Sequence, residues 1–212
     1  MHRTLRLDPD CTLLLMIDFQ EQHRCDPEVL AHAYGDVLLR AAMVLAAARK
    51  SGVGIVHSGF CRDAGVGDCM TRFPLAQFSP ETAAEQDEPN LIRQQLSAFS
   101  SPELSGILED RVCDTLMIAG VWTEATVAAT VRDAVALGLR VLIVKDACGS
   151  GSELMHRTAT LNLGNRLYGG GILDAMRASD LLAGRSARVW MLEEVIPFKY
   201  IPETVTPLYN AL

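Results

Sequence analysis

Two segments of this chain carry the residue types that could support catalysis. In the first, an apolar run at residues 12–18 ends in Asp18, and an unpartnered carboxylate at the end of a buried strand is costly. Asp18 is therefore either a working acid or base, or a helix cap or ion-pair partner. In the second, residues 115–134 predict a strand, a turn at Gly120 and a helix from Glu124. Such a turn aims the first helical N–H groups at one spot, which can hold an anion or a polarised carbonyl oxygen.

Other polar residues give weaker signals. Arg93 lies in a polar patch and, taken alone, is typical of a solvated surface arginine. Asp18, His23 and His57 are too scattered to predict a metal site. Residues 149–151 (Gly-Ser-Gly) lack the third glycine and the lysine of a nucleotide-binding loop, so they predict a turn and a helix cap. We expect no metal and no cofactor.

The elements that must position these residues alternate along the chain. Apolar runs predict buried strands at residues 12–18, 53–57, 115–120 and 140–146, and helical spacing predicts helices at 26–50, 101–109, 124–137 and 153–167, with a short extended piece near 91–99. This order predicts an α/β fold, a three-layer doubly wound sheet of about six mainly parallel strands with helices on both faces. Ligands in such sheets bind beyond the carboxyl ends of the strands, where Asp18, Phe60 and the Gly120 turn should meet. The irregular residues 62–89 should cover a site or an interface, and hold the substrate selectivity.

Composition, net charge and cysteine content limit the partners and the cellular compartment that we expect. The chain has 212 residues, of which 49% are hydrophobic and 21% charged, as in an ordinary globular domain. A net charge of −7 without a Lys/Arg run argues against nucleic acid as a partner, and no apolar stretch is long enough for a bilayer. The first residues lack the apolar core of a signal peptide, and the six cysteines form no CxxC pair. We expect free thiols in the cytoplasm.

The domain organisation follows from a change in composition near residue 187. Residues 1–186 form the expected α/β domain. Residues 187–212 carry aromatic side chains and several prolines, and we interpret them as a tail that packs on the domain or on a partner subunit.

Three segments in the right order resemble the isochorismatase-like hydrolases, also called the cysteine hydrolase superfamily. They are residues 14–20 (Leu-Leu-Met-Ile-Asp-Phe-Gln), the stretch from Arg93 to Phe99 ending in Ser-Ala-Phe, and residues 120–134. The resemblance covers about residues 12–174 and implies a parallel sheet between helices. His156 also lies where these proteins often carry a histidine.

Most of that family uses an Asp, a Lys and a nucleophilic Cys. The resemblance places Asp18 at the Asp position, Arg93 at the Lys position and Thr126 at the Cys position. A threonine hydroxyl cannot become a nucleophile as a thiol does without a strong adjacent base. Arg93 stays charged, so it cannot transfer protons but can hold a carboxylate with two parallel hydrogen bonds.

Two functions are therefore open. In the first, the protein hydrolyses a vinyl ether, an amide or a related bond of a small carboxylate-bearing molecule without a covalent cysteine intermediate. Asp18 would be the acid or base, Arg93 the anion anchor, and N–H groups after Trp122 the oxyanion cradle. The expected substrate-binding residues are Phe19, Phe60, Trp122 and Ala125. In the second, the protein is a silent or repurposed member that binds a small molecule or a protein partner. The resemblance also implies a homodimer or homotetramer.

Overall fold

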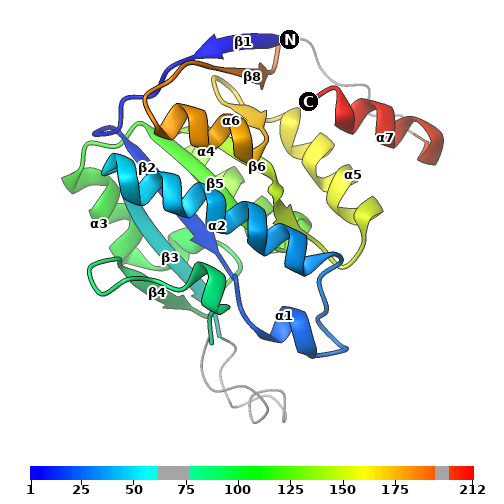
Figure 1. The fold of residues 1–212 in the computed structure, drawn as a ribbon, viewed down its shortest axis with the longest axis horizontal. Coiled ribbons are helices and arrows are strands. Elements are labelled where there is room, and N and C mark those ends of the chain that lie inside the picture. Colours follow the sequence, from blue (N-terminus) through cyan, green and yellow to red (C-terminus); the bar gives the residue numbers. More distant parts are fainter. Residues whose placement is uncertain (62–76, 194–200) are drawn as a thin grey trace.

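Eight strands form a single sheet in the computed structural model, which describes residues 1–61, 77–193 and 201–212. Their order across the sheet is β1-β8-β7-β6-β5-β2-β3-β4. The six strands from β7 to β4 are parallel, and β1 and β8 are antiparallel additions at one edge (Figure 1). The strand bounds are β1 His2–Leu5, β2 Thr12–Ile17, β3 Gly54–Phe60, β4 Asn90–Arg93, β5 Thr115–Val121, β6 Arg140–Gly149, β7 Gly171–Leu173 and β8 Ala187–Met191.

The predicted α/β fold with a mainly parallel sheet is confirmed, whereas the expected count of about six strands is too low. The two additional strands come from opposite ends of the chain and pair with each other, His2 opposite Trp190. Neither is a continuous apolar run: β1 is only partly covered and β8 alternates near its start. A sheet edge with one solvated side does not need the all-apolar sequence of a central parallel strand.

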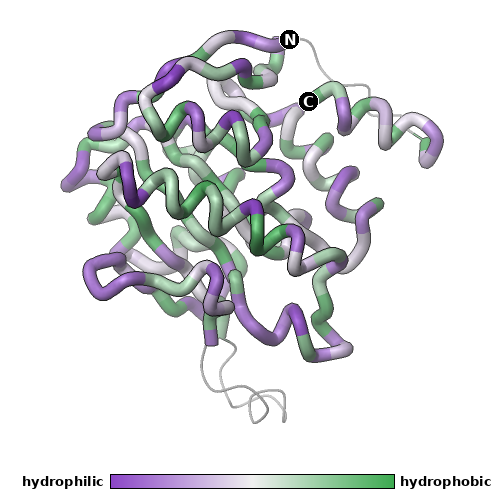
Figure 2. Tube along the Cα trace, viewed as in Figure 1, coloured by the Kyte–Doolittle hydropathy of each residue, from purple (hydrophilic) through white to green (hydrophobic). Residues whose placement is uncertain are grey.

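Helices cover both faces of the sheet (Figure 1). The apolar side chains of α2 and α6 pack on the face that presents Leu14 and Met16, and those of α3, α4 and α5 pack on the face of Leu13, Leu15 and Ile17. Apolar residues accordingly follow the strands and the inner faces of the helices in Figure 2. The helices are α1 Gln22–Cys25, α2 Tyr34–Ser51, α3 Pro102–Asp110, α4 Ala128–Ala136, α5 Glu153–Gly164, α6 Ala175–Leu182 and α7 Pro202–Asn210, with short turns η1 Pro80–Thr82, η2 Ala98–Ser100 and η3 Thr123–Val127.

The helix expected from residue 26 begins only at Tyr34. The Asp26 carboxylate accepts the N–H of Glu28 at 3.0 Å, so it closes a local turn instead of capping a helix. Ala33 then adopts a left-handed conformation, with φ of +50°, immediately before the helix. The helix ends as expected, at Gly52.

Residues 187–212 contribute β8 to the sheet and α7 to its surface. Helix α7 packs beside α5, and Val205 and Leu212 are buried against the core (Figure 1). Of the irregular connection at 62–89, residues 62–76 lie outside the described residues, so the expected cover and selectivity stay predictions there. Within the described ranges, no helix is both long and apolar enough to cross a membrane.

Candidate active site

Asp18 lies at the first position beyond strand β2, where the chain turns sharply. Its backbone N–H donates to the carbonyl oxygen of Ser58 at 2.8 Å, and its φ is +52°. Aspartate is one of the few residues with a side chain that enters this left-handed region readily, and such strain concentrates at functional sites. The residue is only 2% exposed, so its carboxylate needs a partner inside the protein.

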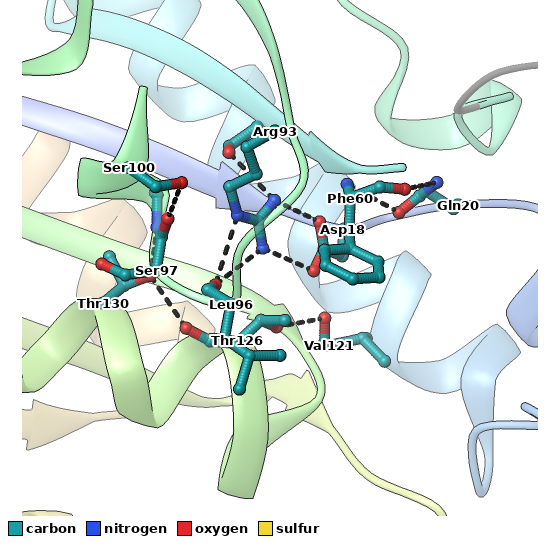
Figure 3. Close-up of polar contacts among 12 residues, drawn as sticks. Asp18, Gln20, Phe60, Arg93, Leu96, Ser97, Ser100, Val121, Thr126 and Thr130 are labelled. Atoms are coloured by element: carbon teal, nitrogen blue, oxygen red, sulfur yellow. Dashed lines mark hydrogen bonds and ion pairs between the residues drawn. The ribbon is translucent and has the colours of Figure 1, made fainter. Parts of the chain in front are cut away.

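That partner is Arg93, at the end of β4. Its Nη1 and Nη2 donate to the two oxygens of Asp18 at 2.7 and 2.8 Å, and both side chains are buried (Figure 3). The prediction of a solvated surface arginine is therefore wrong, because parallel pairing of β3 with β4 places Arg93 two strands from Asp18 at the same sheet edge. With both oxygens accepting from a guanidinium, Asp18 has the geometry of a charged carboxylate.

The remaining donors of Arg93 are also used. Nη1 donates to Ser58 Oγ at 3.1 Å, while Nε and Nη2 share the carbonyl oxygen of Leu96 at 3.2 and 3.1 Å. An arginine has five N–H donors, and here all five have protein acceptors. Both contacts with Leu96 are longer than those with Asp18, and one oxygen of Leu96 serves two donors.

Phe60 closes one side of this ion pair. The guanidinium carbon of Arg93 lies 5.8 Å from the centroid of the Phe60 ring, within cation–π range. The side-chain amide of Gln20 holds the Phe60 backbone from both sides, donating to its carbonyl oxygen at 3.0 Å and accepting its N–H at 3.1 Å. Ser58, Leu96 and Gln20 were not among the predicted site residues.

The neighbouring strand β5 carries the turn predicted to bind an anion. The strand was expected to end at Gly120, but it continues to Val121, with a register shift against β6. The helix then starts with the turn η3, in which the N–H of Val127 bonds to the carbonyl oxygen of Trp122, and continues as α4. The N–H of Ala125 bonds to the same carbonyl oxygen at 3.1 Å, so the predicted anion cradle would have to be formed by other N–H groups of this turn.

Thr126 lies in this turn with its hydroxyl fully engaged. Oγ1 donates to the carbonyl oxygen of Val121 at 2.9 Å and accepts the N–H of Trp122 at 3.1 Å, so it bridges the two sides of the cis Val121–Trp122 peptide. In the described part of the chain, neither a carboxylate nor an imidazole contacts this hydroxyl. A hydroxyl without an adjacent base is not activated for nucleophilic attack.

The Trp122 ring contacts a glycine and a histidine. Its ring rests against Gly151, where a Cβ would come 2.6 Å from Trp122 Cζ3. Its indole Nε1 lies 3.3 Å from His23 Nδ1, and burial lowers the pKa of His23. Residues 149–151 do not form the expected turn and cap, because Gly149 is the last residue of β6 and the cap of α5 is Ser152, which accepts the N–H of Met155.

The other expected binding residues differ in their exposure. Phe60, Trp122 and Ala125 are half-buried and can reach a ligand. Phe19 is 1% exposed and packs in the core on the α2 face.

Among the described residues, the cysteine that lies beside this turn in the sheet supplies no thiolate. Cys148 is the cysteine beside Gly120 in the sheet, and burial raises its pKa to about 12. Its thiol therefore stays protonated. Among the described residues, no group of three or more His, Cys, Asp or Glu side chains is arranged to hold a metal ion.

Comparison with known proteins identifies relatives over most of the chain. The model of the isochorismatase domain family matches residues 12–175. The chain is 30% identical over 189 residues to a maleamate amidohydrolase of Pseudomonas putida, covering 81% of this chain and 88% of that protein. Two solved structures share the fold. A hydrolase of the isochorismatase family from Chromobacterium violaceum has a TM-score of 0.73 at 26% identity, covering 85% of this chain and 97% of that one. A Burkholderia xenovorans protein described as an isochorismatase has a TM-score of 0.74 at 21% identity, covering 94% and 96%.

Proposed function

The chain belongs to the isochorismatase family, and on that premise we propose that it hydrolyses a small carboxylate-bearing molecule without a covalent cysteine intermediate. The observation that supports this most is the buried ion pair of Asp18 and Arg93 at the carboxyl edge of the sheet. A buried carboxylate in a strained backbone position, at the end of the strand that pairs with β5, is costly to the fold and suited to proton transfer.

Asp18 acts as a general base in this proposal. Its two oxygens together offer about four acceptor positions, and Arg93 occupies only two of them. A water molecule can therefore donate to Asp18 and be deprotonated as it attacks the substrate carbonyl. The helical N–H groups after Trp122 stabilise the oxyanion that forms. Thr126 orients the turn and does not attack.

Arg93 binds the substrate carboxylate by exchanging one of its partners. Its Nη1/Nη2 edge faces Asp18, while its Nε/Nη2 edge faces only the carbonyl oxygen of Leu96. A carboxylate offers two oxygens to this second edge and forms two separate bonds in place of one shared acceptor. Leu96 lies on the exposed loop between β4 and η2, with its side chain 51% exposed, so this carbonyl is the partner most readily displaced.

An amide is the preferred bond type among those considered. The maleamate amidohydrolase that this chain resembles is named for an amide substrate that also carries a carboxylate. A base that activates water suits an amide, whereas cleavage of a vinyl ether needs a proton donor, and both oxygens of Asp18 accept hydrogen bonds from Arg93.

The test is turnover of a defined panel by matched variants. Ammonia release from maleamate and related half-amides, and cleavage of isochorismate as the vinyl ether, are measured for the wild type, Asp18→Asn and Thr126→Ala. We expect Asp18→Asn to remove turnover and Thr126→Ala to retain part of it, because loss of a true nucleophile costs about 10⁴-fold or more. Circular dichroism checks that each variant is folded. Undiminished turnover in Asp18→Asn contradicts the proposal.

A second candidate is a silent member that binds a small molecule or a protein partner. This candidate is favoured because all donors of Arg93 and the hydroxyl of Thr126 already have hydrogen-bond partners within the protein, so neither side chain is left to bind a substrate. Here the double variant Thr126→Cys with Arg93→Lys restores the residues of the wider family. Amidase activity that appears only in this double variant supports a disabled site.

We also propose that the chain works in the cytoplasm as a homodimer or homotetramer. Cys11, Cys25, Cys113 and Cys148 are free thiols, which fits a reducing compartment. Ile92 and Leu96, beside the open edge of β4, are 47% and 51% exposed and could be covered by a second copy. Light scattering at micromolar concentration tests the association, and a monomer contradicts it.

A further inference from the structure

The C-terminal helix α7 is connected to the turn of the candidate site by three side chains. Thr123, the first residue of η3, is fully buried, and its Oγ1 lies 2.8 Å from both the carbonyl oxygen of Gly149 and His156 Nδ1. On its other side, His156 Nε2 lies 3.0 Å from the hydroxyl of Tyr209 on α7. A continuous hydrogen-bonded path thus leads from α7 through α5 to the start of η3.

The direction of each bond in this path follows from counting protons. The Gly149 carbonyl can only accept, so the Thr123 hydroxyl donates to it and accepts a hydrogen bond from His156 Nδ1–H. A neutral imidazole has a single N–H, so Nε2 accepts and the Tyr209 hydroxyl donates to it. Burial lowers the pKa of His156 to about 4, which keeps the ring neutral at physiological pH.

Tyr209 is held in place by contacts other than its hydroxyl. Lys145 Nζ donates to the carbonyl oxygen of Tyr209 at 3.1 Å and lies 4.8 Å from its ring centroid. The guanidinium of Arg157 lies 5.5 Å from the same centroid. Val205, one turn earlier on α7, is 2% exposed. These contacts keep the ring in place, so its hydroxyl can be removed without undocking the helix.

We infer that Tyr209 is a positioning residue for the candidate site, and that it acts through His156 on the hydroxyl of Thr123. Thr123 directly follows Trp122, so its position sets where the first N–H groups of η3 point. The inference rests on the proposed function for its catalytic consequence, but its structural consequence can be measured without any substrate.

The primary test is amide hydrogen exchange of residues 123–127 in the full-length protein. Tyr209→Phe keeps the ring and both cation contacts and removes only the donor to His156. Loss of one hydrogen bond predicts exchange about fivefold faster at the turn. His156→Asn, which keeps a donor near Nδ1 but has no acceptor for Tyr209, should give the same increase. Thr206→Val is the matched control, because this hydroxyl on the same helix contacts Arg157 outside the path.

The second readout is nitrogen NMR of ¹⁵N-labelled histidine. The wild type should show His156 protonated at Nδ1, with an Nε2 signal that shifts in Tyr209→Phe and not in Thr206→Val. Protonation at Nε2 in the wild type overturns the assigned path. Unchanged exchange at residues 123–127 in Tyr209→Phe overturns the positioning role, whatever the activity.

Kinetics with any substrate found in the panel completes the test. Tyr209→Phe should lower kcat and leave KM nearly unchanged, because the helical N–H groups are needed most when the oxyanion forms. Faster exchange in a protein that turns over no panel substrate supports the positioning role and counts against the proposed hydrolase. A lower kcat with unchanged exchange contradicts the positioning role of Tyr209 and leaves the proposed hydrolase function standing.

Discussion

In the proposed mechanism, the candidate site depends on Arg93, at a position where the sequence resemblance implies a lysine in most of the family. A lysine ammonium has three donors around one point, whereas the Arg93 guanidinium reaches both Asp18 oxygens, Ser58 and Leu96 in one plane. Arg93 therefore fixes the orientation of Asp18 as well as its charge. Arg93→Lys would keep the charge and lose this geometry, so the exchange is not conservative here.

The ion pair yields a stability prediction. Arg93→Met leaves Asp18 buried and unpaired, and we expect it to lower the free energy of unfolding by about 3–5 kcal/mol. The double variant Asp18→Asn with Arg93→Met removes both charges, and asparagine tolerates the left-handed backbone of position 18. It should be more stable than Arg93→Met alone. Urea unfolding measures the free energy of unfolding of each variant. If the losses from the two single substitutions simply add in the double variant, Asp18 and Arg93 are not coupled.

Single side chains were predicted well where the local sequence determines their position. Asp18 follows an apolar run and Trp122 follows a strand, so both could be placed at the carboxyl edge of the sheet from sequence alone. The acceptors of Arg93 could not be identified from the sequence, because Ser58 and Leu96 come close to Arg93 only through strand pairing and a loop conformation. For the same reason Arg93, taken alone, was interpreted as a surface residue, and only the family resemblance placed it in the candidate site.

At the scale of elements, Gly120 was correctly singled out from the sequence, but its predicted role as the end of a strand is wrong. The sequence favoured it as the end of a strand, yet it lies inside β5, where that strand approaches β2 closely. A Cβ at this position would lie 2.6 Å from Ile17 Cβ and 2.7 Å from the Ile17 carbonyl oxygen. Glycine is needed for this close approach, immediately before Asp18.

This close approach predicts opposite effects for two glycine substitutions. Gly120→Ala should lower the free energy of unfolding by about 1–3 kcal/mol or more, because backbone atoms of Ile17 cannot move aside. Gly106→Ala, inside α3 with open space around it, is the control and should stabilise the protein by about 0.4–1 kcal/mol. Urea unfolding compares them. Equal stabilities would show that β2 and β5 can separate without cost.

Some helices were predicted within a few residues and others were not. Helix α3 and the end of α2 follow from Pro102 and Gly52, which act locally. The start of α2 was wrong, because Asp26 closes a turn and Ala33 reverses the backbone first. Helix α6 was not predicted, although Asp174 caps it and the buried residues Ala175, Ala178, Leu181 and Leu182 have helical spacing.

At the scale of the whole molecule, the class of fold was predictable because the central strands are buried on both faces. Their continuous apolar runs indicate parallel strands between helices wherever they occur. The pairing of β1 with β8 was not predictable, since the two strands lie at opposite ends of the chain and only their contact makes them a sheet edge. The place of α7 on α5 likewise depends on contacts far apart in sequence.

Buried histidines make the stability of the molecule depend on pH. Burial is the main cause that lowers the pKa of His156, to about 4 from an ordinary value of 6.5; the charge of Arg157 acts in the same direction, and a hydrogen bond with the Lys145 backbone opposes it. Burial also lowers the pKa values of His23 and His57. Between pH 4 and 6.5 the unfolded chain binds more protons at His156 than the folded one, so stability must fall as pH falls through this window.

The share of His156 can be isolated by comparing two proteins at two pH values. At one pKa unit per ~1.4 kcal/mol, lowering the pH from 7 to 5 should cost the wild type about 2 kcal/mol at this residue. His156→Gln has no titratable ring, so its free energy of unfolding should fall by that much less over the same interval, even though the variant is less stable at pH 7. Urea unfolding at pH 5 and 7 gives both differences, with His32→Gln, whose ring belongs to an exposed residue, as the control. Identical pH dependence in wild type and His156→Gln would mean that the folded protein does not lower the pKa of His156, and would contradict the neutral ring assigned in the hydrogen-bonded path from Tyr209 to Thr123.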